Sequence, residues 1–189
     1  MTLVESSQAA TSGESYARSM TAASEAWRTY FEGSAMLAAA LERRLKDACG
    51  LDLADFNILL LLSEADDERM RMGTLARQLA FAPGRLTYRM QQLESKGWVR
   101  REASTVDRRG TDAVLTDDGR RTLRRARPLH ARHVEELFLS RITDAEAAQL
   151  EGIFRPVRST LLGECETAQV VEDCETDAAA QESSGADRH

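Results

Sequence analysis

Arginine, tyrosine and glutamine side chains recur at helical spacing near the middle of the chain. In MGTLARQLAFAPGRLTYRMQQLESKG, residues 72–97, the apolar positions Leu86, Met90 and Leu93 are three or four residues apart, which predicts the buried face of a helix. The polar residues left for the outer faces are Arg85, Thr87, Tyr88, Arg89 and Gln92, with Arg77 on the segment before. Arginine binds phosphate as a fork, and arginine and glutamine also hydrogen-bond to base edges. The pattern indicates a surface for a polyanion, with an ordinary solvated helix face as the alternative.

A second charged group lies in a loop further along the chain. Asp107, Arg108 and Arg109 stand between WVRREA, residues 98–103, and TDAVLT, residues 111–116, and both of these segments have the alternating pattern of short strands. At the tip of such a hairpin the arginines could enter a narrow DNA minor groove, whose negative potential attracts guanidinium groups. Asp107 would orient one of them through a surface ion pair.

Two short helices joined by a tight turn must position the polar residues from Arg77 to Gln92. The turn spans residues 80–82, and Pro83 suits the first position of the second helix. Helix, turn and helix at this spacing predict a helix-turn-helix. Because the predicted hairpin follows directly, we expect a mainly α (α+β) fold, a winged helix-turn-helix with a two-stranded β-hairpin wing.

The helices predicted around this unit have recognisable starts. Asp52 is the predicted N-cap of an apolar helix, and Thr116 is the N-cap of a helix that follows the hairpin. Thr143 begins another helix, with Glu146 completing a capping box. The apolar stripes of residues 25–49 and 117–162 exceed what a small winged helix can cover, so we expect these N- and C-terminal helices to form a dimerisation region.

Charge is unevenly distributed along the 189 residues, whose net charge is −6. Residues 69–127 hold 15 Lys and Arg against 6 Asp and Glu, a net charge of +9. The flanking segments are acidic, at −7 for residues 1–68 and −8 for residues 128–189. A basic block of this size favours binding of a nucleic acid despite the acidic total.

The expected organisation is one domain with two polar ends. Residues 1–20 and 163–189 lack apolar periodicity and are predicted to be disordered, the second as an acidic tail. Residues 21–162 form the predicted winged-helix domain, with a DNA-binding lobe at about 52–116. No window suggests a membrane span and the N-terminal stretch does not resemble a signal sequence, so we expect a cytoplasmic protein.

Catalysis, metals and cofactors have little support in the sequence. There is no P-loop, G-x-G-x-x-G, G-x-S-x-G or H-E-x-x-H motif, so we expect no enzyme and no cofactor. His130, His133 and Glu136 have a spacing that could contribute to a metal site, but no further ligands support one. The three cysteines, Cys49, Cys165 and Cys174, form no C-x-x-C pair.

Three segments together resemble the MarR-type (multiple antibiotic resistance regulator) family. They are LADFNILLLLSEA, LARQLAFAPGRLTYRMQQLESKGWVRR and DRRGTDAVLTDDGR, and the resemblance covers about residues 27–162. It implies a homodimer that binds palindromic operator DNA, usually as a repressor. Asp107 and Arg109 match the family's wing pair, and residues 82–94 match its recognition helix. The run Thr87-Tyr88-Arg89 departs from the family's Thr-Arg and shifts the arginine by about 100° around the helix.

The resemblance also implies a small, often aromatic and anionic effector that binds between the dimer interface and the DNA-binding lobe. Trp27, Tyr30, Phe31 and Phe56 are the candidates for lining such a crevice, although core packing explains aromatic residues at helical spacing at least as well. We therefore expect a sequence-specific transcriptional regulator with double-stranded DNA and a second copy of itself as partners. A constitutive or architectural DNA-binding protein without an effector is the alternative.

Overall fold

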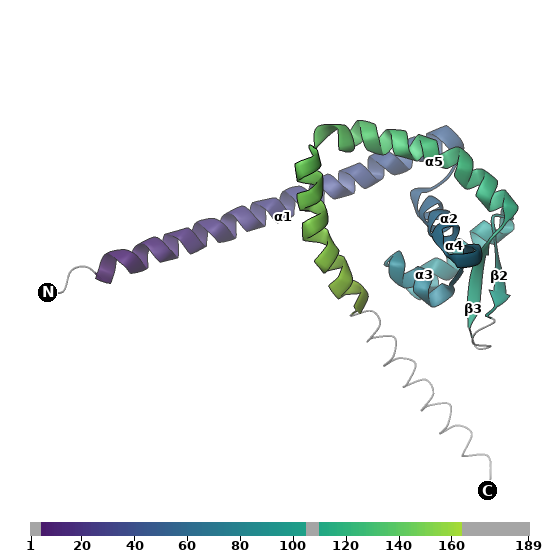
Figure 1. Ribbon diagram of the computed structural model, residues 1–189, viewed down its shortest axis with the longest axis horizontal. Helices are drawn as coiled ribbons and strands as arrows, with labels where there is room; N and C mark the ends of the chain where they lie inside the picture. Colours follow the sequence, from purple (N-terminus) through teal and green to yellow (C-terminus); the bar gives the residue numbers. More distant parts are fainter. Residues whose placement is uncertain (1–4, 105–109, 164–189) are drawn as a thin grey trace, which may run out of the picture.

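Helices surround a small antiparallel sheet in the computed structural model, which describes residues 5–104 and 110–163 but not the side chains of residues 5–20 and Pro83. The elements are α1 (Glu5–Cys49), α2 (Leu53–Glu64), η1 (Asp66–Glu68), β1 (Arg69–Arg71), α3 (Met72–Gln78), α4 (Pro83–Ser95), β2 (Val99–Ala103), β3 (Thr111–Leu115), α5 (Asp117–Leu137) and η2 (Leu139–Arg141). A C-terminal helix follows at residues 144–163. The predicted mainly helical winged helix-turn-helix is confirmed (Figure 1).

The sheet has three strands in the order β1-β3-β2, not the two that were predicted. β2 and β3 form the expected hairpin, and β1 pairs with the other edge of β3, with Arg69 opposite Val114. The Arg69 guanidinium also donates to Glu102 at 2.7 Å, across the sheet. Three residues are too few to show a strand period, so only the tertiary pairing identifies β1.

Helix α1 is much longer than predicted. It begins at Glu5, whereas the sequence predicted disorder over residues 1–20 and a helix from about residue 25. Extending an existing helix adds one hydrogen bond per residue without a new nucleus, and Gly13 is the only glycine or proline between Glu5 and Trp27. In Figure 1 the N-terminal part of α1 projects away from the rest of the molecule.

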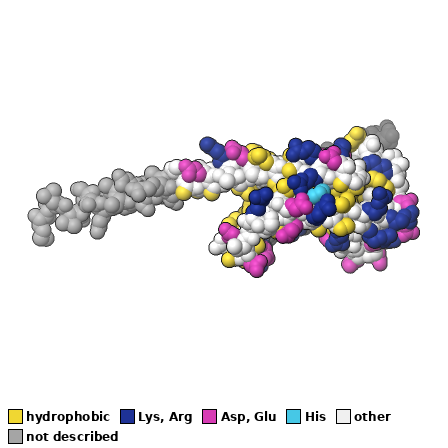
Figure 2. All heavy atoms as spheres, turned by 90° about the horizontal axis from the view of Figure 1, so that it is seen from above, with side chains coloured by type: hydrophobic (Ala, Val, Ile, Leu, Met, Phe, Trp, Pro, Cys, Tyr) yellow, Lys and Arg dark blue, Asp and Glu magenta, His cyan; other side chains and the backbone are white. Residues whose placement is uncertain are grey.

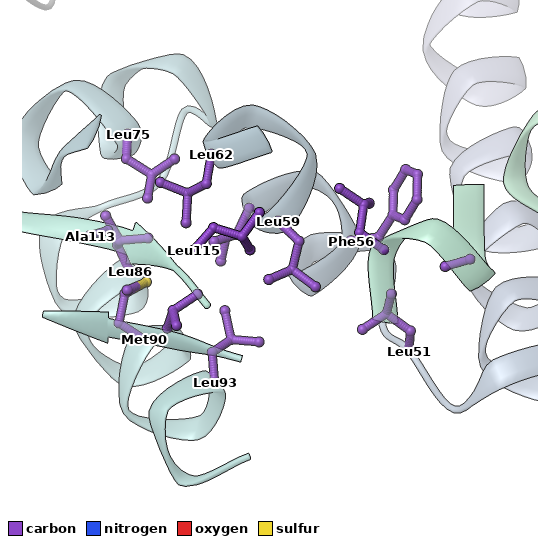
Figure 3. Close-up of a cluster of buried hydrophobic side chains, with 14 of the residues drawn as sticks. Leu51, Phe56, Leu59, Leu62, Leu75, Leu86, Met90, Leu93, Ala113 and Leu115 are labelled. Atoms are coloured by element: carbon purple, nitrogen blue, oxygen red, sulfur yellow. The ribbon is translucent and has the colours of Figure 1, made fainter. Parts of the chain in front are cut away.

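The hydrophobic core lies between α2, α4 and the sheet. Leu86, Met90 and Leu93 of α4 are fully or almost fully buried, as predicted, and they meet Leu59 of α2 and Leu115 of β3 in one cluster (Figure 3). Helix α2 is buried on most of its circumference, so it forms the centre of the lobe. Within the described residues, no helix is both long and apolar enough to cross a membrane.

Two of the three predicted helix caps form as expected. The Thr116 hydroxyl accepts the Gly119 amide at 3.1 Å and donates to the Gly97 carbonyl. Thr143 and Glu146 make the reciprocal bonds of a capping box. Asp52 occupies the N-cap position of α2, but its side chain makes no capping hydrogen bond because it pairs with two cations instead.

The half-buried His130 is expected to make the free energy of unfolding depend on pH. The His130 ring stacks on Phe56 at 4.4 Å between centroids, and burial, with a smaller contribution from His133, lowers the pKa of His130 below 6.5. The folded state therefore favours the neutral ring. The free energy of unfolding is therefore highest above pH 6.5, where the ring is neutral in both states. It decreases as the pH falls from 6.5 toward the pKa of His130 in the folded protein.

The melting temperature should accordingly drop between pH 7.5 and 5.5, and His130→Gln should reduce this drop. Thermal unfolding at several pH values, at one protein concentration, checks it. Carboxylates titrate mainly below this range, so they contribute little to the difference. An equal decrease in both proteins would contradict the assignment to His130.

Candidate nucleic-acid interface

The outer face of α4 carries most of the side chains predicted to bind DNA. Arg85, Thr87, Tyr88 and Gln92 are exposed, and Tyr88 is 60% exposed although it is a large aromatic residue. The Arg85 guanidinium lies over the Phe81 ring, 4.4 Å from its centroid, which holds it beside the start of the helix. Arginine, tyrosine and glutamine can donate to phosphates and base edges.

Arg89 does not face outward, and this prediction is wrong. Its side chain turns toward the N-terminal end of α2, where Nη1 is 3.0 Å from Asp52 Oδ2 and 3.2 Å from Asp55 Oδ1. The ion pairs with both residues raise the pKa of the guanidinium despite its burial, and the pKa of Asp52 is lowered by Lys46 first and then by Arg89. Arg89 is therefore engaged within the protein.

Helical geometry could have revealed the position of Arg89. At about 100° per residue, Arg89 lies directly beside Met90 and three positions from Leu86, at the edge of the buried stripe. Arg85 and Gln92 are further around the helix. A cation that flanks an apolar stripe, together with Asp52 and Asp55 at the start of the earlier buried helix α2, is the pattern expected of an internal ion pair.

The hairpin lies next to α4 in the chain and in space. The Arg101 side chain of β2 donates to Glu94 of α4 at 2.9 Å, which ties the two elements together. At the wing base, a Cβ on Gly110 would overlap the Arg71 guanidinium, so glycine permits this close approach. Asp107, Arg108 and Arg109 lie outside the described residues, and their role at the wing tip stays a prediction.

Several cations of the basic block pair with carboxylates of the acidic segment before it, residues 1–68. Arg120 pairs with Glu68, and Arg127 lies 3.6 Å from Glu64. Arg120 lowers the pKa of Glu68, and Glu68 raises the pKa of Arg120. The net charge of +9 is therefore not a single free patch. Figure 2, which looks onto α5 from above, shows acidic side chains interspersed among the Lys and Arg side chains.

Arg77 lies away from this face, in a cleft between α3 and the C-terminal helix. It donates to Thr74 at 3.2 Å, and it shares the cleft, of about 850 Å³, with Tyr30 and Phe154. Arg155 and Arg158 also line it. The cleft thus combines aromatic and cationic groups at the junction of α1, the C-terminal helix and the helix-turn-helix.

The four predicted effector residues do not come together. Trp27, Tyr30 and Phe31 form a group on α1 with ring centroids 5.9 and 6.1 Å apart, and the Tyr30 ring lies 4.8 Å from Phe154. Phe56 is only 1% exposed and belongs to the core beside His130. The prediction that Phe56 lines a crevice is therefore wrong, because a fully buried ring has no surface left for a ligand.

Cys49 has a structural position at the end of α1. The Cys49 thiol donates to the Leu45 carbonyl at 3.2 Å and packs against the core. Among the described residues, no three His, Cys, Asp or Glu side chains are placed to hold a metal ion. Cys165 and Cys174 lie outside the described residues.

The helix-turn-helix, the hairpin and the exposed α4 face together define a winged-helix nucleic-acid-binding fold. A model of the MarR family matches residues 50–110. The transcriptional repressor MprA of Escherichia coli (strain K12) is 30% identical over 123 residues, 64% of this chain and 69% of the relative. The regulator MhqR of Bacillus subtilis (strain 168) is 33% identical over 89 residues, 47% of this chain but only 60% of the relative.

A solved structure extends the similarity to most of the domain. Sco3205, a MarR family transcriptional regulator from Streptomyces coelicolor in complex with DNA, is 35% identical with a TM-score of 0.69, and the match covers 73% of this chain and 90% of that one. The chain therefore belongs to the MarR family of winged-helix transcriptional regulators. The relatives named above are transcriptional regulators, in agreement with the expectation that the chain is not an enzyme.

Proposed function

We propose that this chain is a sequence-specific DNA-binding repressor that acts as a homodimer on palindromic operator DNA and is released by a small aromatic or anionic effector. The exposed outer face of α4, beside the β2–β3 hairpin, is the observation that carries the proposal. The DNA complex of Sco3205 supports the DNA-binding part, and the repressor MprA supports the direction of regulation.

In this proposal α4 enters the major groove and the wing meets the backbone and adjacent minor groove. Arg85 binds phosphate, and Thr87, Tyr88 and Gln92 reach base edges. Asp107, Arg108 and Arg109 form the wing contact. Arg77 and Arg89, which the sequence grouped with them, are left out of this contact because they face the cleft and α2.

Apolar surface on α1 and the C-terminal helix supports a homodimer. Phe31, Met36 and Ile153 are each at least 60% exposed, which is unusual for large apolar side chains in a folded monomer. A groove of about 470 Å³ between these helices is lined by Leu37, Phe138 and other apolar residues. A second subunit would cover this surface and place the two α4 helices about 34 Å apart, one turn of DNA.

The cleft between α3 and the C-terminal helix supports an effector site. Tyr30 and Phe154 offer ring faces, while Arg77 and Arg158 offer positive charge, so an aromatic carboxylate would match both. Arg155 also lines the cleft but pairs with Glu151 at 3.9 Å. Because the cleft joins the proposed dimer helices to the helix-turn-helix, a ligand there could change the spacing of the two α4 helices. An inducer must raise the melting temperature and weaken DNA binding together.

Binding of the purified protein to its own upstream DNA, with unlabelled competitor and across a salt series, tests the proposal. Tight, competitor-resistant binding of one dimer to one two-fold site is expected. If competitor DNA abolishes binding both to the upstream DNA and to sites selected from random sequence, sequence-specific regulation is contradicted. If operator binding is specific but no aromatic carboxylate weakens it, the constitutive alternative holds.

Arg85→Met should weaken binding to operator and non-specific DNA alike. Arg85 is exposed and has no ion pair among the described residues, so it is available to phosphate. Because a bound dimer carries two copies of Arg85, losing one phosphate contact per subunit should lower the slope of log affinity against log salt by about 2. Fluorescence anisotropy at several salt concentrations measures this slope. An unchanged slope would exclude a phosphate contact at this position.

A further inference from the structure

We propose that Arg89 and Asp55 set the orientation of α4, and thereby its choice of DNA sequence, without contacting DNA. They belong to an ion cluster of five residues, which we call the α2 cap cluster: Lys46, Asp52, Asp55, Arg89 and Lys96. The proposal rests on the DNA-binding function proposed above. In this inference the residues of the cluster position α4 and do not bind DNA themselves.

Every carboxylate oxygen of the α2 cap cluster lies within 3.3 Å of a cationic nitrogen. Asp52 Oδ1 lies 2.9 Å from Lys46 Nζ, and Asp52 Oδ2 lies 3.0 Å from Arg89 Nη1. Asp55 Oδ1 lies 3.2 Å from the same Nη1, and Asp55 Oδ2 lies 3.3 Å from Lys96 Nζ. The cluster therefore joins the end of α1, the start of α2, the middle of α4 and Lys96, the residue that caps the end of α4.

Burial makes this geometry restrictive. Asp55 is 1% exposed, and a buried carboxylate is strongly destabilising unless cations and hydrogen bonds compensate it. Arg89 and Lys96 must therefore stay close to Asp55. They are seven residues apart, about 10 Å along the helix axis, so the middle of α4 and its C-cap are both held against one side chain of α2.

Apolar packing alone would hold α4 less specifically. The contacts of Leu86, Met90 and Leu93 with the core are non-directional, and they could persist through a small rotation or slide of the helix. Hydrogen bonds to base edges would not persist through such a movement, because a displacement of a few tenths of an ångström or a rotation of about 10–20° destroys their geometry. The cluster supplies the directional restraint that sequence readout by Tyr88 and Gln92 requires.

The cluster also connects α4 with the proposed dimer helix. Lys46 is in the last turn of α1, and its partner Asp52 is shared with Arg89. A change in the direction of α1 would therefore alter the cluster that positions α4.

The test uses operator DNA selected by the full chain from random sequences, and compares Arg89→Met and Asp55→Asn with the parent. For both variants we expect operator affinity to fall about 10-fold while non-specific affinity and its salt slope stay nearly unchanged, as for residues that act through other groups. Arg89→Lys keeps a cation that can meet one carboxylate, so it should restore part of the operator affinity. Circular dichroism establishes that each variant is folded.

Arg85→Met is the matched control, one turn away on the same helix, because a phosphate contact changes the salt slope on every sequence. If Arg89→Met behaves like Arg85→Met, or if folded variants keep the parent's ratio of operator to non-specific affinity, the proposal is overturned. Should Asp55→Asn fail to fold, Arg89→Met and Arg89→Lys decide alone. Failure to select any site would overturn the proposed function as well, whereas a selected site that the variants bind normally would overturn only this inference.

Discussion

Gly119→Ala is expected to lower the free energy of unfolding by about 2–3 kcal/mol, the range of severe overpacking. A Cβ at this position would overlap the Trp98 carbonyl oxygen and lie 2.8 Å from Leu115 Cδ1. The carbonyl belongs to the backbone and cannot move aside cheaply, since it also accepts the Thr116 amide at 3.1 Å. Relieving the overlap would shift the start of α5 away from the hairpin.

Urea unfolding at a single protein concentration measures this effect. Gly73→Ala is the matched control, because Gly73 is exposed near the start of α3 and its Cβ would meet only Arg77 Nη1, at 3.9 Å. That substitution should be neutral or stabilising by up to about 1 kcal/mol, the usual gain of alanine over glycine in a helix. If the free energy of unfolding of Gly119→Ala lies within about 0.5 kcal/mol of the parent value, the close approach of Gly119 to the Trp98 carbonyl is contradicted. Ordinary surface substitutions scatter over that range.

The features that could be predicted from the sequence are those with local causes. The buried stripe of Leu86, Met90 and Leu93 follows from the helical period, and the caps at Thr116 and Thr143 follow from side chains that bond to amides three residues away. The hairpin follows from alternation on both sides of a polar loop. Together these were sufficient for the winged helix and its exposed α4 face.

The features that could not be predicted depend on contacts between distant segments. β1 is defined by its pairing with β3, and Gly119 has no local signature because its constraint comes from Trp98, 21 residues earlier. The net charge of the basic block was misleading, since several of its cations pair with carboxylates of residues 1–68, such as Glu68. The position of Phe56 could not be decided from the sequence either, because an aromatic residue at helical spacing is compatible with a core or with a cleft.

Dimerisation provides the second large expected effect. Ile153→Glu should weaken self-association by more than about 100-fold, because burying an unpaired carboxylate in an apolar interface costs several kcal/mol. Ile153 is 60% exposed and belongs to the apolar stripe of the C-terminal helix. Since each subunit would then read only half of a two-fold site, operator affinity should fall together with dimerisation.

Sedimentation equilibrium and operator binding of the same samples measure both effects. Ala148→Glu adds the same charge to an exposed position of the same helix, about 140° around it from Ile153, and should leave the dimer intact. If Ile153→Glu remains dimeric, the exposed stripe is not the interface and the apolar groove beside Phe138 needs another occupant. If it becomes monomeric yet binds the operator as tightly as the parent, two-fold recognition is wrong, because a single α4 helix and wing would then supply all of the affinity.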